Sequence, residues 1–296
     1  MTNQECRSRW TKTITSEVMT STIQTVSLRQ MSAISTTLGE ALRMWRARRR
    51  LSQLDLAGEA EVSTRHLSFI ESGRASPSRH VLLRLAEALR LPLREQNQLL
   101  RTAGFAPIYE ERAFSSPDME NALVAVEAVL RAHAPFPALA VDRHWNLVLA
   151  NDTARQMLIG IDERLLRPPV NVLRATFHPQ GLAPRILNLA EWRHHVLSRL
   201  RRDIDQSADP VLEALHTELS GFPFPASRRP PSSTERIAVT LSIRGEANRG
   251  VMSFLSTTTV FGTAVDVTLA ELTLECFYPA DEKTRKSLME GMTNPL

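Results

Sequence analysis

The chain has 296 residues, of which 43% are hydrophobic, and a formal net charge of +4 at pH 7. This length suits two ordinary domains better than a single large one. No run of 18 apolar residues occurs and the first residues contain no apolar h-region, so the sequence predicts neither a membrane span nor a secretory signal. The two cysteines, Cys6 and Cys276, form no CxxC or metal-spaced motif, which favours a reducing cytoplasm without a disulfide framework.

The positive charge is concentrated in one early segment. Residues 38–104 carry 12 arginines against 7 acidic residues, whereas residues 105–296 are net negative. A compact basic segment predicts a nucleic-acid binder. A solvated, arginine-rich helical surface would give the same count and is the alternative.

The first elements in chain order are helical. Residues 1–36 are rich in Ser and Thr without a sustained period, which predicts a disordered tail. Helical spacing of apolar residues, Ser at expected N-caps and Gly at expected ends then predict five short helices. They span residues 38–50, 52–60, 63–72, 78–91 and 94–104. The sequence therefore predicts a compact all-α domain over residues 37–104, followed by a Pro- and Ser-containing linker over residues 105–117.

The remaining chain, residues 118–290, mixes helical and strand-like patterns. A helix is expected at 119–133, then a hairpin of two strands at 137–142 and 145–151, joined at Arg143–His144. Further helices are expected at 152–159, 171–177 and 187–204, an irregular loop at 221–233, and three alternating strands at 235–243, 250–260 and 268–277. This order predicts a separate α+β domain around an antiparallel sheet.

The two helices within residues 52–73 have the pattern of a DNA-reading unit. Their interhelical core would consist of apolar residues, and the mouth of the second helix would present polar ones. The apolar set is Leu56, Ala57, Val62, Leu67 and Ile70, and the polar set is Thr64, Arg65, His66 and Ser68. In a helix-turn-helix, the second helix enters the major groove by its N-terminal end, which needs this distribution.

The stretch LSQLDLAGEAEVSTRHLSFIESGRASPS resembles the Xre (Cro/repressor-like, lambda-repressor-like) helix-turn-helix. The matching positions are Ser52, Gln53, Leu56, Ala57, Val62, Ser63, Leu67, Ser68, Ile70, Glu71, Gly73 and Pro77. The resemblance implies that Gln53 touches a phosphate and braces the next helix, and that Thr64, Arg65 and His66 reach base edges. Arginine suits bidentate bonding to guanine N7 and O6. A solvated surface histidine remains the alternative for His66.

The same resemblance assigns roles to the flanking residues. Ser63 would cap the recognition helix and leave its amide end facing phosphate, Ser68 would lie on the outer face, and Arg74 and Ser76 would contact phosphates. One position departs from the family pattern, because Glu61 stands where the turn usually has glycine. If that turn keeps a positive φ, a non-glycine residue brings strain of order 1 kcal/mol.

The second domain resembles MmyB-like regulators, in which a PAS-like ligand-binding domain follows an Xre helix-turn-helix. The resemblance rests on phrases such as DRHWNLVLAN, NVLRATFHPQGLAP and FLSTTTVFGTAVDVTLAELTLECFYPAD. It implies a bacterial one-component regulator that binds an operator in double-stranded DNA as a homodimer and senses a fatty-acid-like or other small apolar molecule. We expect no cofactor. Candidate ligand-binding residues are Trp145, Asn151, Phe177, His178, Phe254 and Phe261.

Structural roles compete with ligand binding at each of these positions. The aromatic residues could fill a core, His178 could make a structural hydrogen bond, and Asn151 could cap the helix that follows it. Two further alternatives concern the whole domain: a dimerisation or protein-interaction module, and an unrecognised enzyme. Against an enzyme, the chain lacks GxSxG, HExxH and Gly-rich phosphate motifs, and its lysines occur only at 12, 283 and 286. We therefore expect no catalytic residues and no metal site.

Overall fold

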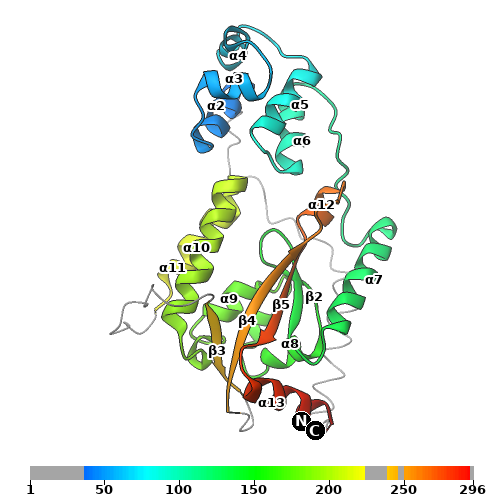
Figure 1. Ribbon diagram of the computed structural model, residues 1–296, viewed down its shortest axis with the longest axis vertical. Helices are drawn as coiled ribbons and strands as arrows, with labels where there is room; N and C mark the ends of the chain where they lie inside the picture. The colour runs from blue at the N-terminus through cyan, green and yellow to red at the C-terminus, as the bar shows by residue number, and fades with distance from the viewer. Residues whose placement is uncertain (1–36, 224–238, 246–249, 294–296) are drawn as a thin grey trace.

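The computed structural model describes residues 37–223, 239–245 and 250–293, and it has two parts, one helical and one built on a sheet (Figure 1). The helical part consists of five short helices, as the sequence predicts. They are α2 (Leu38–Arg48), α3 (Gln53–Glu59), α4 (Thr64–Glu71), α5 (Arg79–Ala88) and α6 (Leu93–Thr102). In the first four, the hydroxyl of the preceding Thr or Ser accepts a backbone N–H of the first turn, which satisfies a donor that the helix itself cannot pair.

One apolar cluster holds the five helices together. Leu42 and Trp45 of α2 pack with Leu56 of α3 and with Leu67 and Ile70 of α4. The predicted interhelical core is confirmed for Leu56, Ala57, Leu67 and Ile70, which are almost fully buried, while Val62 packs against them partly buried. Burial of each large aliphatic side chain stabilises the fold by about 1.5–3 kcal/mol.

The second part is built on a five-stranded antiparallel sheet, also as the sequence predicts. Its strand order is β2-β1-β5-β4-β3. The strands are β1 (Ala138–Val141), β2 (Leu147–Ala150), β3 (Thr240–Arg244), β4 (Val251–Val260) and β5 (Thr273–Pro279). The predicted hairpin is present, with Ala140 opposite Leu149. The last strand in the chain, β5, lies between β1 and β4 and so joins the hairpin to the rest of the sheet.

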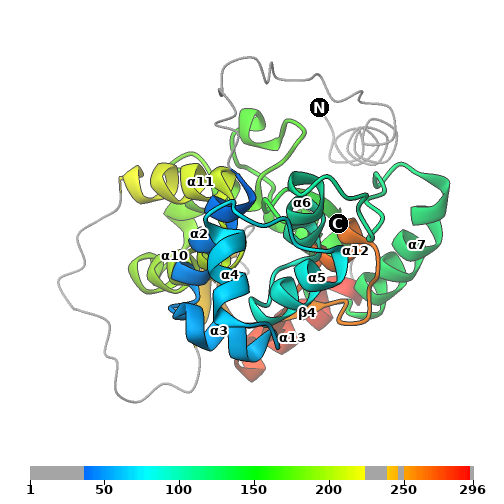
Figure 2. The same cartoon turned by 90° about the horizontal axis from the view of Figure 1, so that it is seen from above.

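Helices cover both faces of the sheet. Helix α7 (Pro117–Ala132) packs on one face, where Val126 and Leu130 meet Ala138, Ala140 and Leu274. Helices α10 (Leu189–Ser207) and α11 (Pro210–Gly221) lie on the other side (Figures 1 and 2). Shorter helices fill the connections. They are α8 (Asp152–Met157), α9 (Val172–Phe177), α12 (Val267–Ala270) and the 3-10 turns η1 (Glu163–Leu166) and η2 (Ala183–Arg185). Helix α13 (Glu282–Thr293) follows β5.

The structure differs from the predicted elements at α12, α11 and α13. The run 268–277 is not one strand, because Asp266 caps the short helix α12 by accepting the N–H of Leu269, and β5 begins only at Thr273. Helices α11 and α13 were not predicted, although Asp209 followed by proline is a helix-start signal. Of the predicted strand 235–243, only residues from 239 are described. The predicted tail 1–36 and most of the predicted loop 221–233 also lie outside the described residues.

The two parts touch at the C-terminal end of α10. The guanidinium of Arg49, at the end of α2, donates to the carbonyl oxygens of Asp205 (3.1 Å) and Gln206 (3.2 Å). Ala208, which ends α10, packs against the core of the helical part. A second contact joins α6 to the sheet part, because Arg94 donates to both carboxylate oxygens of Glu271 at 2.8 Å. None of the helices described in the structure is both long and apolar enough to cross a membrane.

Candidate DNA interface and ligand-binding core

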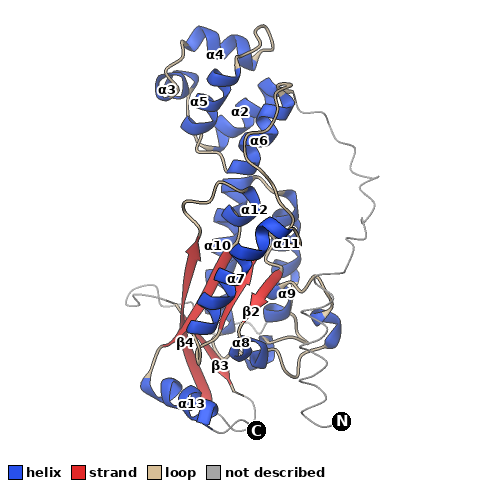
Figure 3. Ribbon diagram, turned by 90° about the vertical axis from the view of Figure 1, so that its right-hand side faces the viewer, coloured by secondary structure: helices blue, strands red, loops and turns tan. Residues whose placement is uncertain are grey.

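Helix α4 lies at the end of the molecule that is remote from the sheet (Figure 3). Ser63 caps the helix, its hydroxyl accepting the N–H of His66 at 3.1 Å. Thr64 and Arg65 are exposed, and His66 and Ser68 are half-buried. The first turn of α4 carries no acidic residue, so nothing there repels a phosphate from the positive end of the helix.

Two arginines lie beside one aromatic ring on this surface. The guanidinium of Arg65 lies 5.4 Å from the ring centroid of Phe69, and that of Arg74 lies 6.0 Å from it. Stacking on an aromatic face restricts the orientation of a guanidinium without using its N–H donors. Ser76 is exposed in the segment after α4. The shared Phe69 ring therefore brings Arg65 of α4 close to Arg74 of the segment that follows α4.

Gln53 braces α4, as the resemblance implies. Its side-chain amide donates to Glu71 Oε2 at 2.8 Å, and Glu71 is the last residue of α4. Glu71 also accepts two hydrogen bonds from Arg46 of α2, at 2.7 and 3.0 Å. This carboxylate thus ties three helices together while only 3% of the residue is exposed.

The Glu71 cluster is a feature that the sequence analysis missed. Burial alone would raise the pKa of Glu71, but the hydrogen bonds from Arg46 and Gln53 lower it below its usual value. The close approach of α2 to the backbone of Glu71 explains Gly39, where a Cβ atom would lie 2.2 Å from the backbone oxygen of Glu71. The sequence signal was a glutamate at a helix position whose neighbour one turn earlier on the same face, Leu67, is apolar.

The turn between α3 and α4 adopts the strained conformation considered above. Glu61 has φ +50°, in the left-handed region that favours glycine. Its carboxylate lies 3.4 Å from the Arg84 guanidinium, but the Glu61 side chain is 81% exposed, so this ion pair contributes little. The departure from the family pattern therefore leaves the turn geometry in place and carries backbone strain.

The six candidate ligand-binding residues do not gather at one place. Trp145, Phe177 and Phe254 belong to one apolar cluster between the sheet and α10, and each is at most 7% exposed. Phe261 packs into the other cluster, on the α7 face. His178 is half-buried, and its Nδ1 accepts the N–H of Gln180 at 3.1 Å.

Asn151 makes a full set of internal hydrogen bonds. Its side-chain oxygen accepts the N–H groups of Ala154 (3.0 Å) and Ala138 (3.1 Å), and its amide donates to the carbonyls of Leu130 and Phe136. It therefore caps α8, which is the structural alternative that the sequence left open. An amide with every donor and acceptor in use is a positioning element of the fold.

A buried ion pair lies beside the first cluster and was not anticipated. Arg199 of α10 donates to Glu275 of β5 at 2.7 Å, and its guanidinium stacks 4.6 Å from the Trp145 ring centroid. Glu275 is 5% exposed and also lies within hydrogen-bonding distance of the Thr258 hydroxyl. A charged residue in the otherwise apolar run LECF was the available sequence signal.

Surface depressions occur away from this cluster. One is lined by the segment after α6, including Ile108, Tyr109 and Arg112, and another lies beside Glu61 and Arg84. Within the described ranges, no three His, Cys, Asp or Glu side chains are grouped as metal ligands.

Comparison with known proteins identifies both parts. A family model of the MmyB-like transcription regulator ligand binding domain matches residues 124–290, and a helix-turn-helix domain model matches residues 37–99. No curated protein matches the chain. The Xre subfamily remains a prediction from the sequence. Because the first match covers more than half of the chain, the protein belongs to the MmyB-like transcription regulators, with a DNA-binding helix-turn-helix domain followed by a ligand-binding domain.

Proposed function

We propose that this regulator binds an operator as a homodimer in the bacterial cytoplasm and that a small apolar, fatty-acid-like ligand changes its affinity for DNA. The observation that carries the proposal is the uncovered N-terminal end of α4 on a domain that is tied by hydrogen bonds to a ligand-binding domain. The functional units would be residues 37–104 and 118–290, joined by 105–117. A dimer would read half-sites about one helical turn, ~34 Å, apart.

The DNA contacts divide into two kinds. Thr64, Arg65 and His66 would meet base edges, because they occupy the N-terminal turn of α4, where Thr64 and Arg65 are exposed and His66 is half-buried. The remaining residues would contact the phosphate backbone of the DNA. Such contacts position the protein on the duplex without specifying a base sequence. These residues are Gln53, Ser63, Ser68, Arg74 and Ser76.

Arg65→Ala and Arg74→Ala should separate these two kinds of contact. Loss of Arg65 removes a bidentate guanine contact, so binding to the operator should weaken by about 1–3 kcal/mol and discrimination at one base pair should disappear. Loss of Arg74 should weaken operator and random DNA alike and reduce the salt dependence of binding. Both guanidinium groups stack on Phe69, so the pair is matched. Fluorescence anisotropy on selected and randomised duplexes measures both effects, and equal losses for Arg65→Ala on the two duplexes would contradict its assignment to a base.

The ligand proposal rests on the apolar cluster between α10 and the sheet. Trp145, Phe177 and Phe254 are buried in it, and Arg199 lies at its edge. An apolar chain inserted there would contact α10 along the face that carries Trp192, Val196 and Leu200. A shift of α10 would also move the helix-turn-helix domain, because Arg48 and Arg49 of that domain donate to the last carbonyls of α10.

Native mass spectrometry of freshly purified protein, with solvent extraction of what is released, tests the ligand and the dimer together. We expect a dimer with one discrete adduct of fatty-acid mass per subunit. A clean dimer would remove the support for a fatty-acid-like ligand while keeping the dimer. A clean monomer would contradict the paired half-sites.

A second candidate function has an observation of its own. Phe254 is 0% exposed and Trp145 is 7% exposed, as in a core that is already filled. A domain of this kind would act as a dimerisation or protein-interaction module without a ligand. The stability of Phe254→Ala distinguishes a filled core from a space that a ligand occupies.

A further inference from the structure

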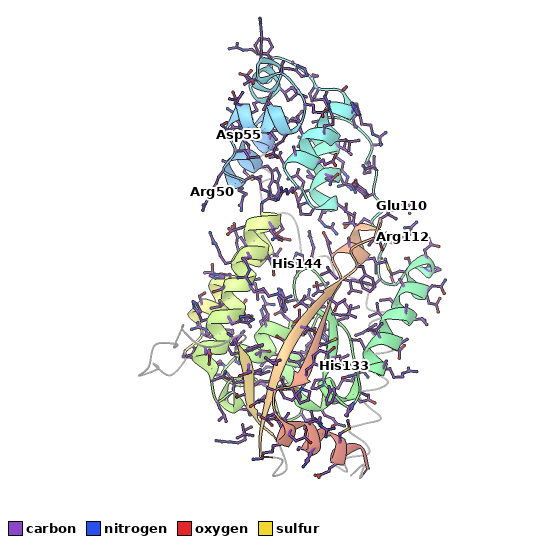
Figure 4. The ribbon with its side chains drawn as sticks, viewed as in Figure 1. Arg50, Asp55, Glu110, Arg112, His133 and His144 are labelled. Carbon is purple, nitrogen blue, oxygen red and sulfur yellow. The ribbon has the colours of Figure 1, made fainter. Side chains whose placement is uncertain are left out.

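The turn between β1 and β2 directs three consecutive side chains to three different parts of the molecule. Trp145 enters the apolar cluster of the ligand-binding domain. His144 bonds Asp209 at the start of α11, and Arg143 lies between Asp209 (3.5 Å) and Glu271 (4.0 Å). In Figure 4, His144 lies at the end of the sheet part that faces the helix-turn-helix domain. This turn is therefore in contact with both the sensing core and the boundary between the domains.

Trp145 holds a backbone conformation that bulky residues rarely adopt. Its φ is +66°, in the left-handed region. Hydrogen bonds impose this conformation, because Asp142 accepts the N–H groups of His144, Trp145 and Asn146, and the Trp145 carbonyl accepts the N–H of Val172. Strain that the surroundings over-determine is typical of switch segments. A ligand that displaced the Trp145 ring would relax this turn.

His144 connects the turn to the joint between α10 and α11 through a hydrogen bond. Its Nε2 lies 2.9 Å from Asp209 Oδ2, and Asp209 caps α11 by accepting the N–H of Val211 at 2.8 Å. Burial alone would raise the pKa of Asp209, but the hydrogen bonds from His144 and Val211 lower it, so Asp209 is a carboxylate at neutral pH. A movement of His144 would therefore displace Asp209, the residue that caps α11.

The helix-turn-helix domain holds the other side of the same joint. Ala208, with φ +55°, ends α10 directly before Asp209. Arg48 and Arg49 of α2 donate to the last carbonyls of α10, and Arg49 also donates to the Leu89 carbonyl at the end of α5. On the far side of the turn, Glu271 joins Arg143 to Arg94 of α6. One connection leads from residues 143–144 to α2, which packs on α4, and the other leads to α6, which packs on α2 and α5.

We propose that the turn Asp142–Trp145 is the relay between the ligand-binding core and the DNA-binding domain, acting through His144 and Asp209 on the α10–α11 joint. The relay rests on the proposed ligand-sensing function and assigns its route. It has two states, with Trp145 either in its strained turn and packed in the core or displaced. Ligand and DNA bias the same element, so each must alter the other's binding.

Hydrogen–deuterium exchange tests the relay without a ligand. Because coupling is reciprocal, adding a selected operator duplex to the full chain should change exchange at the amides of residues 204–208 and 144–146 by at least twofold. In His144→Ala the change should persist at 204–208 and fall by at least half at 144–146, where Arg143 alone still contacts Asp209 and Glu271. His194→Ala, which removes an exposed histidine of α10, is the matched control and should respond as the wild type does. An unaltered turn in the wild type, or an undiminished response in His144→Ala, would overturn the relay.

A second measurement adds hexadecanoate as the probe ligand. In the wild type, saturating hexadecanoate should shift the operator Kd by about fivefold or more. In His144→Ala the Kd for hexadecanoate should stay within twofold of the wild type, while the shift in operator Kd falls below twofold. A full shift in His144→Ala would contradict the relay. If the wild type itself does not respond to hexadecanoate, the proposed ligand fails, and the exchange experiment still decides the relay.

Discussion

Replacing Glu71 with alanine should destabilise the helix-turn-helix domain by about 3 kcal/mol. The change removes three hydrogen bonds and leaves the Arg46 guanidinium, whose side chain is 19% exposed, without its carboxylate. Removal of one member of a buried ion pair is far more damaging than the net contribution of the pair suggests, because the remaining charge stays desolvated. For a domain of this size the unfolding midpoint should fall by about 15 °C.

Thermal unfolding followed by calorimetry measures this effect, and Glu59→Ala provides the control. Glu59 is an exposed glutamate of α3, so its replacement should change stability by less than about 0.5 kcal/mol. Operator binding should be lost with folding, since Glu71 joins α2, α3 and α4. A loss below about 1 kcal/mol would show that the three helices hold together without this carboxylate.

Acid provides a second readout of the same residue. The folded-state pKa of Glu71 lies below its ordinary value of 4.5. Its contribution is therefore fully present above the unfolded-state pKa and is lost as pH falls through the folded-state pKa. The stability of the wild type should approach that of Glu71→Ala as the pH is lowered below about 4.5, so the difference between them should shrink.

The helical domain was predictable because its signals are local. Ser52, Ser63 and Ser78 each cap the helix that follows, as hydroxyls do wherever the chain turns into a helix. The Arg46–Glu71 pair was not predictable, because the two residues are 25 positions apart and their contact requires the packed arrangement of α2 on α4. The same holds for Gly39, whose necessity depends on the backbone of Glu71.

The ligand-binding domain was predictable in its strands and less so in their arrangement. Alternation identifies a strand, but it does not say which strand pairs with which, and the central place of β5 follows from contacts distant in sequence. For the same reason the sequence could not separate Phe261 from Trp145 and Phe254. All three are aromatic residues in or beside strand-like runs, and only the packing of the folded domain places them in different clusters.

Phe254→Ala should destabilise the ligand-binding domain by about 3–5 kcal/mol and lower its unfolding midpoint by about 10 °C. Phe254 is fully buried on β4, and its ring meets Phe277 edge to face at 6.3 Å. Truncation removes the transfer free energy of the ring and leaves a cavity that neighbours fill only partly. Tyr278→Ala is the control, because Tyr278 is 44% exposed on the neighbouring strand and its loss should change stability far less.

The size of this loss distinguishes the two functions considered for the domain. If the core around Phe254 is filled by side chains alone, Phe254→Ala should lose the full ~3–5 kcal/mol of stability, because nothing else occupies the new cavity. If the space beside Phe254 belongs to an apolar ligand, protein freed of lipid should lose less than about 1 kcal/mol on truncation, and added hexadecanoate should stabilise wild type and variant alike. A full loss that hexadecanoate reverses only in Phe254→Ala would instead mean that the ring itself occupies the place of the ligand. In that case the filled core is one state of the domain, and displacement of the side chains that fill it is the event that the domain detects.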